Sequence, residues 1–177
     1  PPEFAGGLDT VSAFVSPQMT FPNGCHVCEV EIDPDTGVVA VVAYTAVDDV
    51  GTILQPAIVD GQIHGGVAQG IGQVLGEQVV YDAAGQLVTA SFMDYPMPRA
   101  DDLPALAVDH HAVPCTTNPL GVKGAGESGV AGALPATMAA ILDALAARGV
   151  DALDMPATPQ RVWTALRDAA PPPGREP

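Results

Sequence analysis

Nine consecutive residues, Gly121-Val122-Lys123-Gly124-Ala125-Gly126-Glu127-Ser128-Gly129, combine one acid and one base with small neighbours. Glycine lets another group approach the backbone closely, so a loop of this composition suits something bulky pressed against it. A carboxylate set among such small residues can be partly desolvated and is then a candidate base. We therefore take Glu127 as the candidate catalytic residue, against the plainer interpretation of a loop that leads into a helix.

Other reactive side chains do not form a convincing site. Cys25 and Cys28 invite a metal or redox interpretation, but they lie in a stretch that predicts a strand. Residues three apart on a strand point to opposite faces, which makes them a poor chelating pair. The same argument applies to His110 and His111, to which we assign no function. Ser128 has no accompanying His–Asp arrangement and no Gly-x-Ser-x-Gly motif, so nucleophilic catalysis is disfavoured.

Composition limits the class of protein. The chain has 177 residues, 47% of them hydrophobic and 15% charged, which allows one domain with its own core. The net charge of −15 disfavours a nucleic-acid partner. No apolar run approaches the roughly 18 residues of a membrane-spanning helix. No signal peptide is visible, so we expect a cytoplasmic protein; a periplasmic one stays open because the chain begins at Pro1 without a methionine.

Alternating apolar and polar residues predict β-hairpins. The first hairpin turns at Asp33-Pro34-Asp35-Thr36-Gly37 and the second at Asp82-Ala83-Ala84-Gly85, both typical turn sequences. A further strand is expected shortly before the glycine-rich loop. The predicted strands are residues 24–32, 38–47, 77–81, 86–92 and 106–113.

Two main helices are expected, so the fold class is α+β. Apolar residues recur about every four positions from Ala57 to Leu75, and Pro135 to Ala147 predicts a second helix with Ile141 and Leu145 on its buried face. Thr158-Pro159 is a helix N-cap followed by proline at the first helical position and predicts a short third helix.

The first predicted helix is unusually rich in glycine. Gly61, Gly65, Gly66, Gly70 and Gly72 each cost about 1 kcal/mol relative to alanine in a helix interior. Close packing against another backbone explains most of them. A second interpretation is that the side bearing Gly66 approaches a bound cofactor, to which the nearby Gln69 offers its amide.

Three motifs together resemble the molybdenum hydroxylases, the xanthine dehydrogenase and aldehyde oxidase family. They are residues 121–129, Gly61-Gln62-Ile63-His64-Gly65-Gly66-Val67-Ala68-Gln69-Gly70-Ile71-Gly72, and Ser91-Phe92-Met93-Asp94-Tyr95. The resemblance runs from about Phe21 to Trp163 and covers only the C-terminal part of the molybdopterin-binding large subunit. It divides the chain into an extended N-terminal segment (1–20), a C-terminal portion of the molybdopterin-binding domain (21–168) and a disordered tail (169–177).

The resemblance implies a function. Members of this family oxidise an aldehyde or nitrogen heterocycle with oxygen taken from water, using molybdenum held by a pterin cofactor, here expected in its cytosine dinucleotide form. It implies that Glu127 is the base that deprotonates Mo–OH, and that Gln69 lies near the metal. We add Gly66 and the loop residues Lys123, Gly124, Ala125 and Gly126 as cofactor contacts; Lys123 can instead stabilise the loop.

The resemblance also implies partners. The upstream part of the subunit would complete the site, and iron–sulfur clusters and FAD would lie on other subunits. The chain alone is therefore not expected to turn over a substrate. A different class of function stays open, in which the chain is a non-catalytic structural or assembly module that retains the motif.

Overall fold

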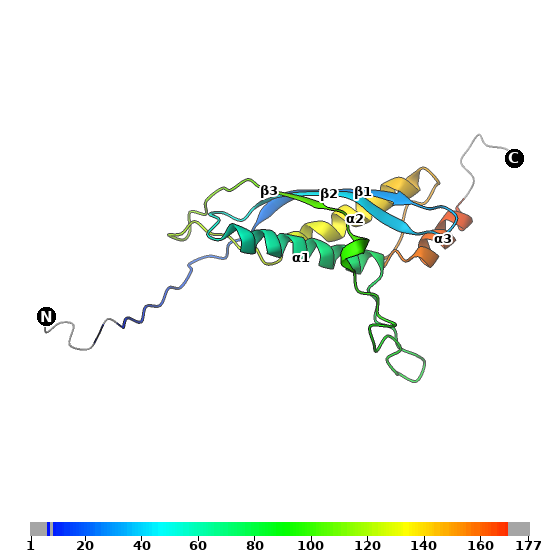
Figure 1. The fold of residues 1–177 in the computed structure, drawn as a ribbon, viewed down its shortest axis with the longest axis horizontal. Coiled ribbons are helices and arrows are strands. Elements are labelled where there is room, and N and C mark those ends of the chain that lie inside the picture. The colour runs from blue at the N-terminus through cyan, green and yellow to red at the C-terminus, as the bar shows by residue number, and fades with distance from the viewer. Residues whose placement is uncertain (1–6, 8, 170–177) are drawn as a thin grey trace.

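The computed structural model describes Gly7 and residues 9–169 of the chain. In this part, a three-stranded sheet has the order β1-β2-β3, with β1 spanning Asn23–Ile32, β2 Val39–Asp49 and β3 Leu106–His110. Strands β1 and β2 are antiparallel, and β3 runs parallel to β2. Helix α1 (Pro56–Leu75) lies in the connection between β2 and β3, as a parallel pair requires. The predicted α+β class is confirmed (Figure 1).

The first hairpin is confirmed, and its turn shows why it forms. Both carboxylate oxygens of Asp33 accept hydrogen bonds, one from the backbone N–H of Asp35 at 2.9 Å and one from the Thr36 hydroxyl at 2.7 Å. Gly37 takes φ +73°, a left-handed conformation that suits glycine. The pairing shifts register between Glu29 and Val30, whose partners are Ala43 and Val41, so the bulge lies in β2 at Val42.

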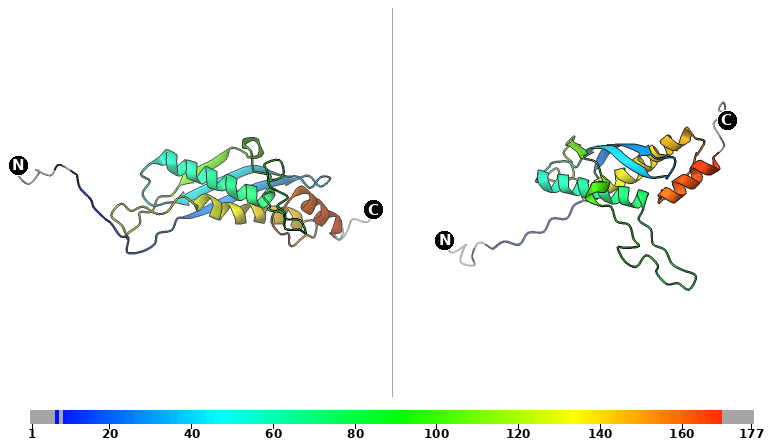
Figure 2. Two further views of the ribbon diagram at one scale, coloured as in Figure 1. Left: turned by 90° about the horizontal axis from the view of Figure 1, so that it is seen from below. Right: turned by 45° about the vertical axis from the view of Figure 1, so that its right-hand side comes forward.

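Helices α1 and α2 (Ser128–Ala146) lie side by side on one face of the sheet (Figure 2). Their apolar faces and the inner face of β2 form the main core. Its buried members are Val41, Tyr44, Ala46, Ile63, Val67, Ile71 and Ala133. The predicted apolar stripe of the first helix therefore does face the core, because its period matches that of the helix.

The two helices approach so closely that their backbones touch. A Cβ atom added at Gly66 would lie 2.7 Å from the nitrogen of Val130, and one added at Gly129 would lie 2.5 Å from the carbonyl oxygen of Ile63. One turn further on, a Cβ added at Gly70 would lie 2.6 Å from the Cβ of Ala133 and 3.2 Å from the nitrogen of Leu134. Of the two interpretations of the glycine-rich helix, packing accounts for Gly66 and Gly70.

Helix α2 begins seven residues earlier than predicted, at Ser128 rather than Pro135. Proline suggests a helix start because it lacks an N–H donor, but it removes only one intrahelical bond. The start is instead set where Gly129 packs against α1, with the N–H of Ala131 bonded to the Glu127 carbonyl at 3.0 Å. The glycine-rich loop therefore ends directly in the helix.

The two strands predicted for the second hairpin, residues 77–81 and 86–92, do not form. Residues 77–98, which we call the arm, project away from the body (Figure 1). They contain an isolated bridge between Tyr81 and Leu87, formed by backbone bonds from Asp82 to Gln86 and from Val88 to Val80. An isolated two-stranded hairpin is marginally stable without a third strand or a surface to pack on.

Strand β3 is also shorter than predicted. After His110 the chain bonds to the end of β2 instead, because the His111 N–H donates to the Asp48 carbonyl.

Helix α3 (Pro159–Asp168) confirms the predicted cap. The Thr158 hydroxyl accepts a hydrogen bond from the Arg161 N–H at 3.4 Å, and Pro159 occupies the first helical position. The second core cluster joins α3 to the C-terminal ends of α1 and α2, with Val74, Ile141, Leu145 and Val162 buried.

The two ends of the chain were predicted to lie outside the folded part. Residues 9–22 carry no helix or strand, and the predicted tail (169–177) lies outside the described residues apart from Ala169.

Helix α2 modifies one expectation from composition. Its 19 residues have a mean hydropathy of 1.6, enough in length and composition to cross a membrane. In this structure one face of α2 packs against α1 and β1. It is therefore a helix of the folded body, and a core helix passes the same test of composition.

Adjacent glycines of α1 provide a matched pair of variants. Gly66→Ala should lower the free energy of unfolding by about 1–3 kcal/mol, because the new methyl group overlaps the α2 backbone. Gly65→Ala should raise it by up to about 1 kcal/mol, because its Cβ meets no atom of the described residues within 4 Å and alanine favours the helix. Denaturant unfolding of both variants measures the difference, and equal effects would contradict the packing.

Candidate functional site

The glycine-rich loop is held at its start by the backbone that follows β2. The carbonyl oxygen of Gly121 accepts the N–H of Thr52 at 2.8 Å and that of Cys115 at 2.9 Å. The N–H of Lys123 donates to the Val50 carbonyl at 2.9 Å. Asn118 adds a two-way bond to Val122, accepting its N–H at 3.1 Å and donating to its carbonyl at 2.9 Å. The first three residues of the loop are therefore fixed.

Lys123 forms an ion pair with Asp49 at the end of β2, with Nζ and Oδ2 2.5 Å apart. Both side chains are mostly buried, at 13% and 12% exposure. Burial raises the pKa of Asp49, but the hydrogen bonds from Lys123 and from the N–H groups of Val113 and Gly51, with the lysine charge, hold it well below its usual range. Of the two roles considered for Lys123, the structure shows the one that stabilises the loop.

Glu127 is exposed at the N-cap of α2. Its side chain makes no capping hydrogen bond within the described part of the chain, so its carboxylate is not used to close the helix. The hydroxyl of Ser128 instead bonds to the Ala125 carbonyl at 3.1 Å. The small neighbours leave the carboxylate open to solvent, so they do not supply the partial desolvation considered for it.

Gln69 is exposed on α1, and the structure shows a second glutamine that the sequence analysis did not consider. The Oε1 of Gln62 lies 3.5 Å from the position of a Cβ on Gly126, so its side chain borders the loop. Gln62 and Gln69 are seven residues apart, which places them on one helix face about 10 Å apart along the axis. This seven-residue spacing is the feature of the sequence that could have identified Gln62. Of the two amides, Gln62 is the one beside the loop.

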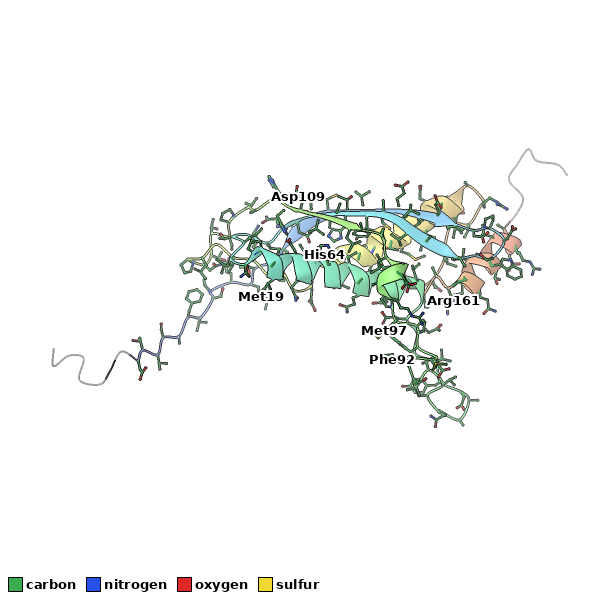
Figure 3. The ribbon with its side chains drawn as sticks, in the orientation of Figure 1. Met19, His64, Phe92, Met97, Asp109 and Arg161 are labelled. Carbon is green, nitrogen blue, oxygen red and sulfur yellow. The ribbon has the colours of Figure 1, made fainter. Side chains whose placement is uncertain are left out.

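Gly66 does not belong to this exposed surface. It is buried, and its free side faces the backbone of Gly129 and Val130 rather than an open space. The predicted cofactor contact of Gly66 is therefore corrected: helix packing occupies that side. His64, labelled on α1 in Figure 3, is exposed and donates from Nδ1 to the carbonyl of Asp60 at 2.7 Å, one turn earlier.

Two hollows flank the loop. One, of about 210 Å³, lies between the loop and the start of α1 and includes Val59, Lys123 and Ala125. The other, of about 240 Å³, lies on the side of β1 and includes His26, Asp48 and Ser128. Glu127 lies in sequence between Ala125 of the first hollow and Ser128 of the second, and Gly124, Gly126 and Glu127 are exposed.

The hydrogen-bonding groups of the loop and of α1 determine what kind of ligand fits the surface around Glu127. The loop and α1 offer exposed backbone, amide side chains and one carboxylate, which are hydrogen-bonding groups. Among the described residues, no group of three or more His, Cys, Asp or Glu side chains is placed to hold a metal ion. The surface thus fits an organic group bound through hydrogen bonds, including one that holds a metal by its own ligands.

Comparison with known proteins agrees with this donor set. A family profile for the molybdopterin cofactor-binding domain matches residues 4–104, more than half of the chain. The chain belongs to this family and corresponds to part of a molybdenum hydroxylase large subunit, as the motifs predicted.

Individual relatives match almost all of the chain. It is 41% identical over 162 residues to the carbon monoxide dehydrogenase large chain of Hydrogenophaga pseudoflava, covering 92% of this chain and 20% of that one. It is 44% identical over 167 residues to the nicotine 6-hydroxylase large subunit of Paenarthrobacter nicotinovorans, covering 94% and 20%. The chain therefore spans about a fifth of the length of these relatives.

Solved structures share the fold. The Cu,Mo-CO dehydrogenase superposes with a TM-score of 0.88 at 36% identity, over 94% of this chain and 21% of that one. Quinoline 2-oxidoreductase from Pseudomonas putida 86 gives 0.81 at 44% identity, over 84% and 19%. The arrangement of sheet and helices described above is thus that of a molybdopterin-binding domain, as predicted.

The Lys123–Asp49 pair should make stability depend on pH. The folded-state pKa of Asp49 lies below its unfolded value of about 4. The pair therefore stabilises the fold fully above that pH, and the contribution is lost as pH falls through the folded pKa. Asp49→Asn should lower the free energy of unfolding by about 2 kcal/mol at pH 7, and by less at pH 3.

Denaturant unfolding at the two pH values measures this, with Asp143→Asn as control because Asp143 is an exposed aspartate of α2. A loss that is the same at pH 7 and pH 3 would show that the ion pair does not supply the effect.

Proposed function

We propose that this chain is the C-terminal part of the molybdenum-containing subunit of an enzyme that oxidises an aldehyde or a nitrogen heterocycle with oxygen from water. The observation that supports this most is the exposed carboxylate of Glu127. It stands where a well-held loop becomes helix α2, beside exposed glycine backbone and within a family that binds molybdopterin.

The bound molybdenum–pterin cofactor, proposed in its cytosine dinucleotide form, would supply the electron-accepting centre and the oxygen to be transferred. The Glu127 carboxylate would accept the proton of the attacking oxygen, which raises that oxygen's nucleophilicity. Backbone groups of Gly124, Ala125 and Gly126 would hydrogen-bond the cofactor, with Gln69 contributing an amide. Lys123 acts through Asp49, by keeping the loop in place.

The exposure of Glu127 is consistent with this role because most of such a subunit lies outside the chain. The arm exposes Val79, Tyr81, Phe92 and Met93, the last two at 79% and 93%. Figure 3 shows Phe92 and Met97 along the arm, away from the core. So many exposed apolar side chains are typical of a surface that contacts another protein segment. We infer that the upstream part of the subunit covers the arm and completes the pocket around Glu127.

Electrons would leave through iron–sulfur clusters and FAD on other subunits, as part of the same proposal. A cluster needs four suitably arranged ligands, and the chain has three cysteines in all. The chain is thus proposed to be active only when assembled with these partners.

Glu127→Gln in the complete enzyme should lower kcat by about 10²- to 10⁴-fold, because the amide cannot accept the proton. Molybdenum and pterin content should stay unchanged, because the variant keeps the size of the side chain. Steady-state kinetics together with metal analysis measures both quantities.

Asp143→Asn, on the same helix but away from the loop, is the matched control and should retain full activity. Full activity of Glu127→Gln would contradict the assignment of the base. A purified wild-type complex that contains neither molybdenum nor pterin would favour a structural or assembly module instead.

The arm offers an independent test of the missing partner. Replacing Phe92 and Met93 by serine should leave the far-UV circular dichroism of the subunit unchanged, because the arm holds no helix or long strand. The same double variant should weaken the interface and at least halve the yield of assembled enzyme on gel filtration. An unchanged yield would place the interface elsewhere.

A further inference from the structure

A directed chain of buried hydrogen bonds lies behind the first turn of α2. The His26 ring bonds through Nδ1 to the Tyr44 hydroxyl at 2.8 Å and through Nε2 to Asp48 Oδ1 at 3.1 Å. The side chains of His26 and Asp48 are only 4% and 2% exposed. A carboxylate only accepts, so we assign the hydrogen to Nε2. With the hydrogen on Nε2, Nδ1 can only accept, so the Tyr44 hydroxyl donates to it. Burial is the main cause that raises the pKa of Tyr44.

Glycines make the room for these side chains. A Cβ on Gly132, in the second turn of α2, would lie 2.5 Å from His26 Nδ1 and 2.6 Å from Cγ, so the ring rests directly on the helix. A Cβ on Gly24 would overlap Asp48 Oδ1. Glycine in a helix interior costs about 1 kcal/mol relative to alanine. The cost at Gly132 is offset by the contact that it allows with the imidazole.

The position of these hydrogen-bonded side chains relative to the glycine-rich loop indicates their role. His26 and Asp48 border the hollow that also includes Ser128, the residue after Glu127. Asp48 and Asp49 are consecutive on β2: Asp49 holds Lys123 at the start of the loop, and Asp48 holds the ring under the first turns of α2. The two carboxylates thus anchor both ends of the segment that presents Glu127.

We propose that His26 and Asp48 are positioning residues, which fix the first turns of α2 and hence the direction in which the Glu127 side chain leaves the helix. This rests on the proposed role of Glu127 only for its effect on catalysis. The anchoring of the helix does not depend on that role. Asp48 Oδ2 has no hydrogen-bond partner among the described residues. The link from this buried carboxylate to α2 is His26, which bonds to Asp48 Oδ1 and packs its ring against Gly132.

The test compares two replacements of one side chain in the complete subunit. His26→Phe keeps a ring in the cavity but loses both hydrogen bonds. His26→Gln keeps a donor for Asp48 and an acceptor for Tyr44. Hydrogen exchange at Ala131, whose N–H bonds to the Glu127 carbonyl, should be about tenfold faster in His26→Phe and within twofold of wild type in His26→Gln.

The amide of Val162 in α3, bonded to Thr158, is the internal control and should not change in either variant. Exchange at Ala131 that is unchanged in His26→Phe would overturn the proposal. So would equal acceleration at Ala131 and Val162, because that reports general destabilisation. If His26→Phe does not fold, Tyr44→Phe takes its place, with an expected acceleration of about threefold at Ala131 and none at Val162.

Steady-state kinetics of the His26 variants distinguish a positioning role of His26 from a role in stability alone. In His26→Phe, kcat should fall about tenfold with KM changed less than twofold, and His26→Gln should recover most of kcat. A kcat that stays at the wild-type value in His26→Phe would overturn the effect on Glu127. Altered exchange with full activity of Glu127→Gln would mean that the proposed base is wrong while the anchoring of α2 stands.

Discussion

Helices α1 and α2 touch through backbone atoms, and the start of α2, where Glu127 lies, depends on that contact. Gly66 and Gly70 on one helix meet Gly129 and Ala133 on the other, so no side chain larger than the Ala133 methyl group lies at these contacts. Any larger residue would push the helices apart, because protein interiors tolerate little overpacking. The contact at Gly129 lies two residues after Glu127 and determines where α2 begins.

The sheet supplies the second constraint on the same segment. Strand β2 ends in two aspartates whose side chains serve different neighbours, Asp49 the loop lysine and Asp48 the histidine under α2. Consecutive residues of a strand point to opposite faces, so one short sequence can hold two different parts of the structure. The glycine-rich loop is therefore constrained at its two ends by β2 and α1, while Gly124 and Gly126 in its middle stay exposed.

An exposed carboxylate on a well-held backbone suits a site that is completed by another part of the protein. The loop and the amides of α1 form one wall, and the arm extends beyond the body with apolar side chains uncovered. A base needs a water-excluding environment to act efficiently, and a fifth of a subunit does not provide one. The exposure of Glu127 and the length of the relatives are both consistent with the proposed shared site.

Patterns local in the sequence were enough for part of this structure. The alternation in Gly24–Ile32, the four-residue apolar repeat of Ala57–Leu75 and the Thr158-Pro159 cap each predicted an element that forms, because periodicity and capping depend on near neighbours. The motifs of residues 61–72, 91–95 and 121–129 were enough to predict the family. The strands of residues 77–81 and 86–92 were also locally plausible, but nothing packs against them to stabilise pairing.

The sequence by itself thus determined the helix and strand types of the core, the family and the candidate base. Only the tertiary structure decided that Gly66 packs on Gly129, that Lys123 binds Asp49 and that His26 lies under α2. These pairs are separated by 63, 74 and 106 residues, counting for the last from His26 to Gly132. Contacts at such separations depend on how α1, α2 and β2 are packed, and no periodicity within one element records that packing.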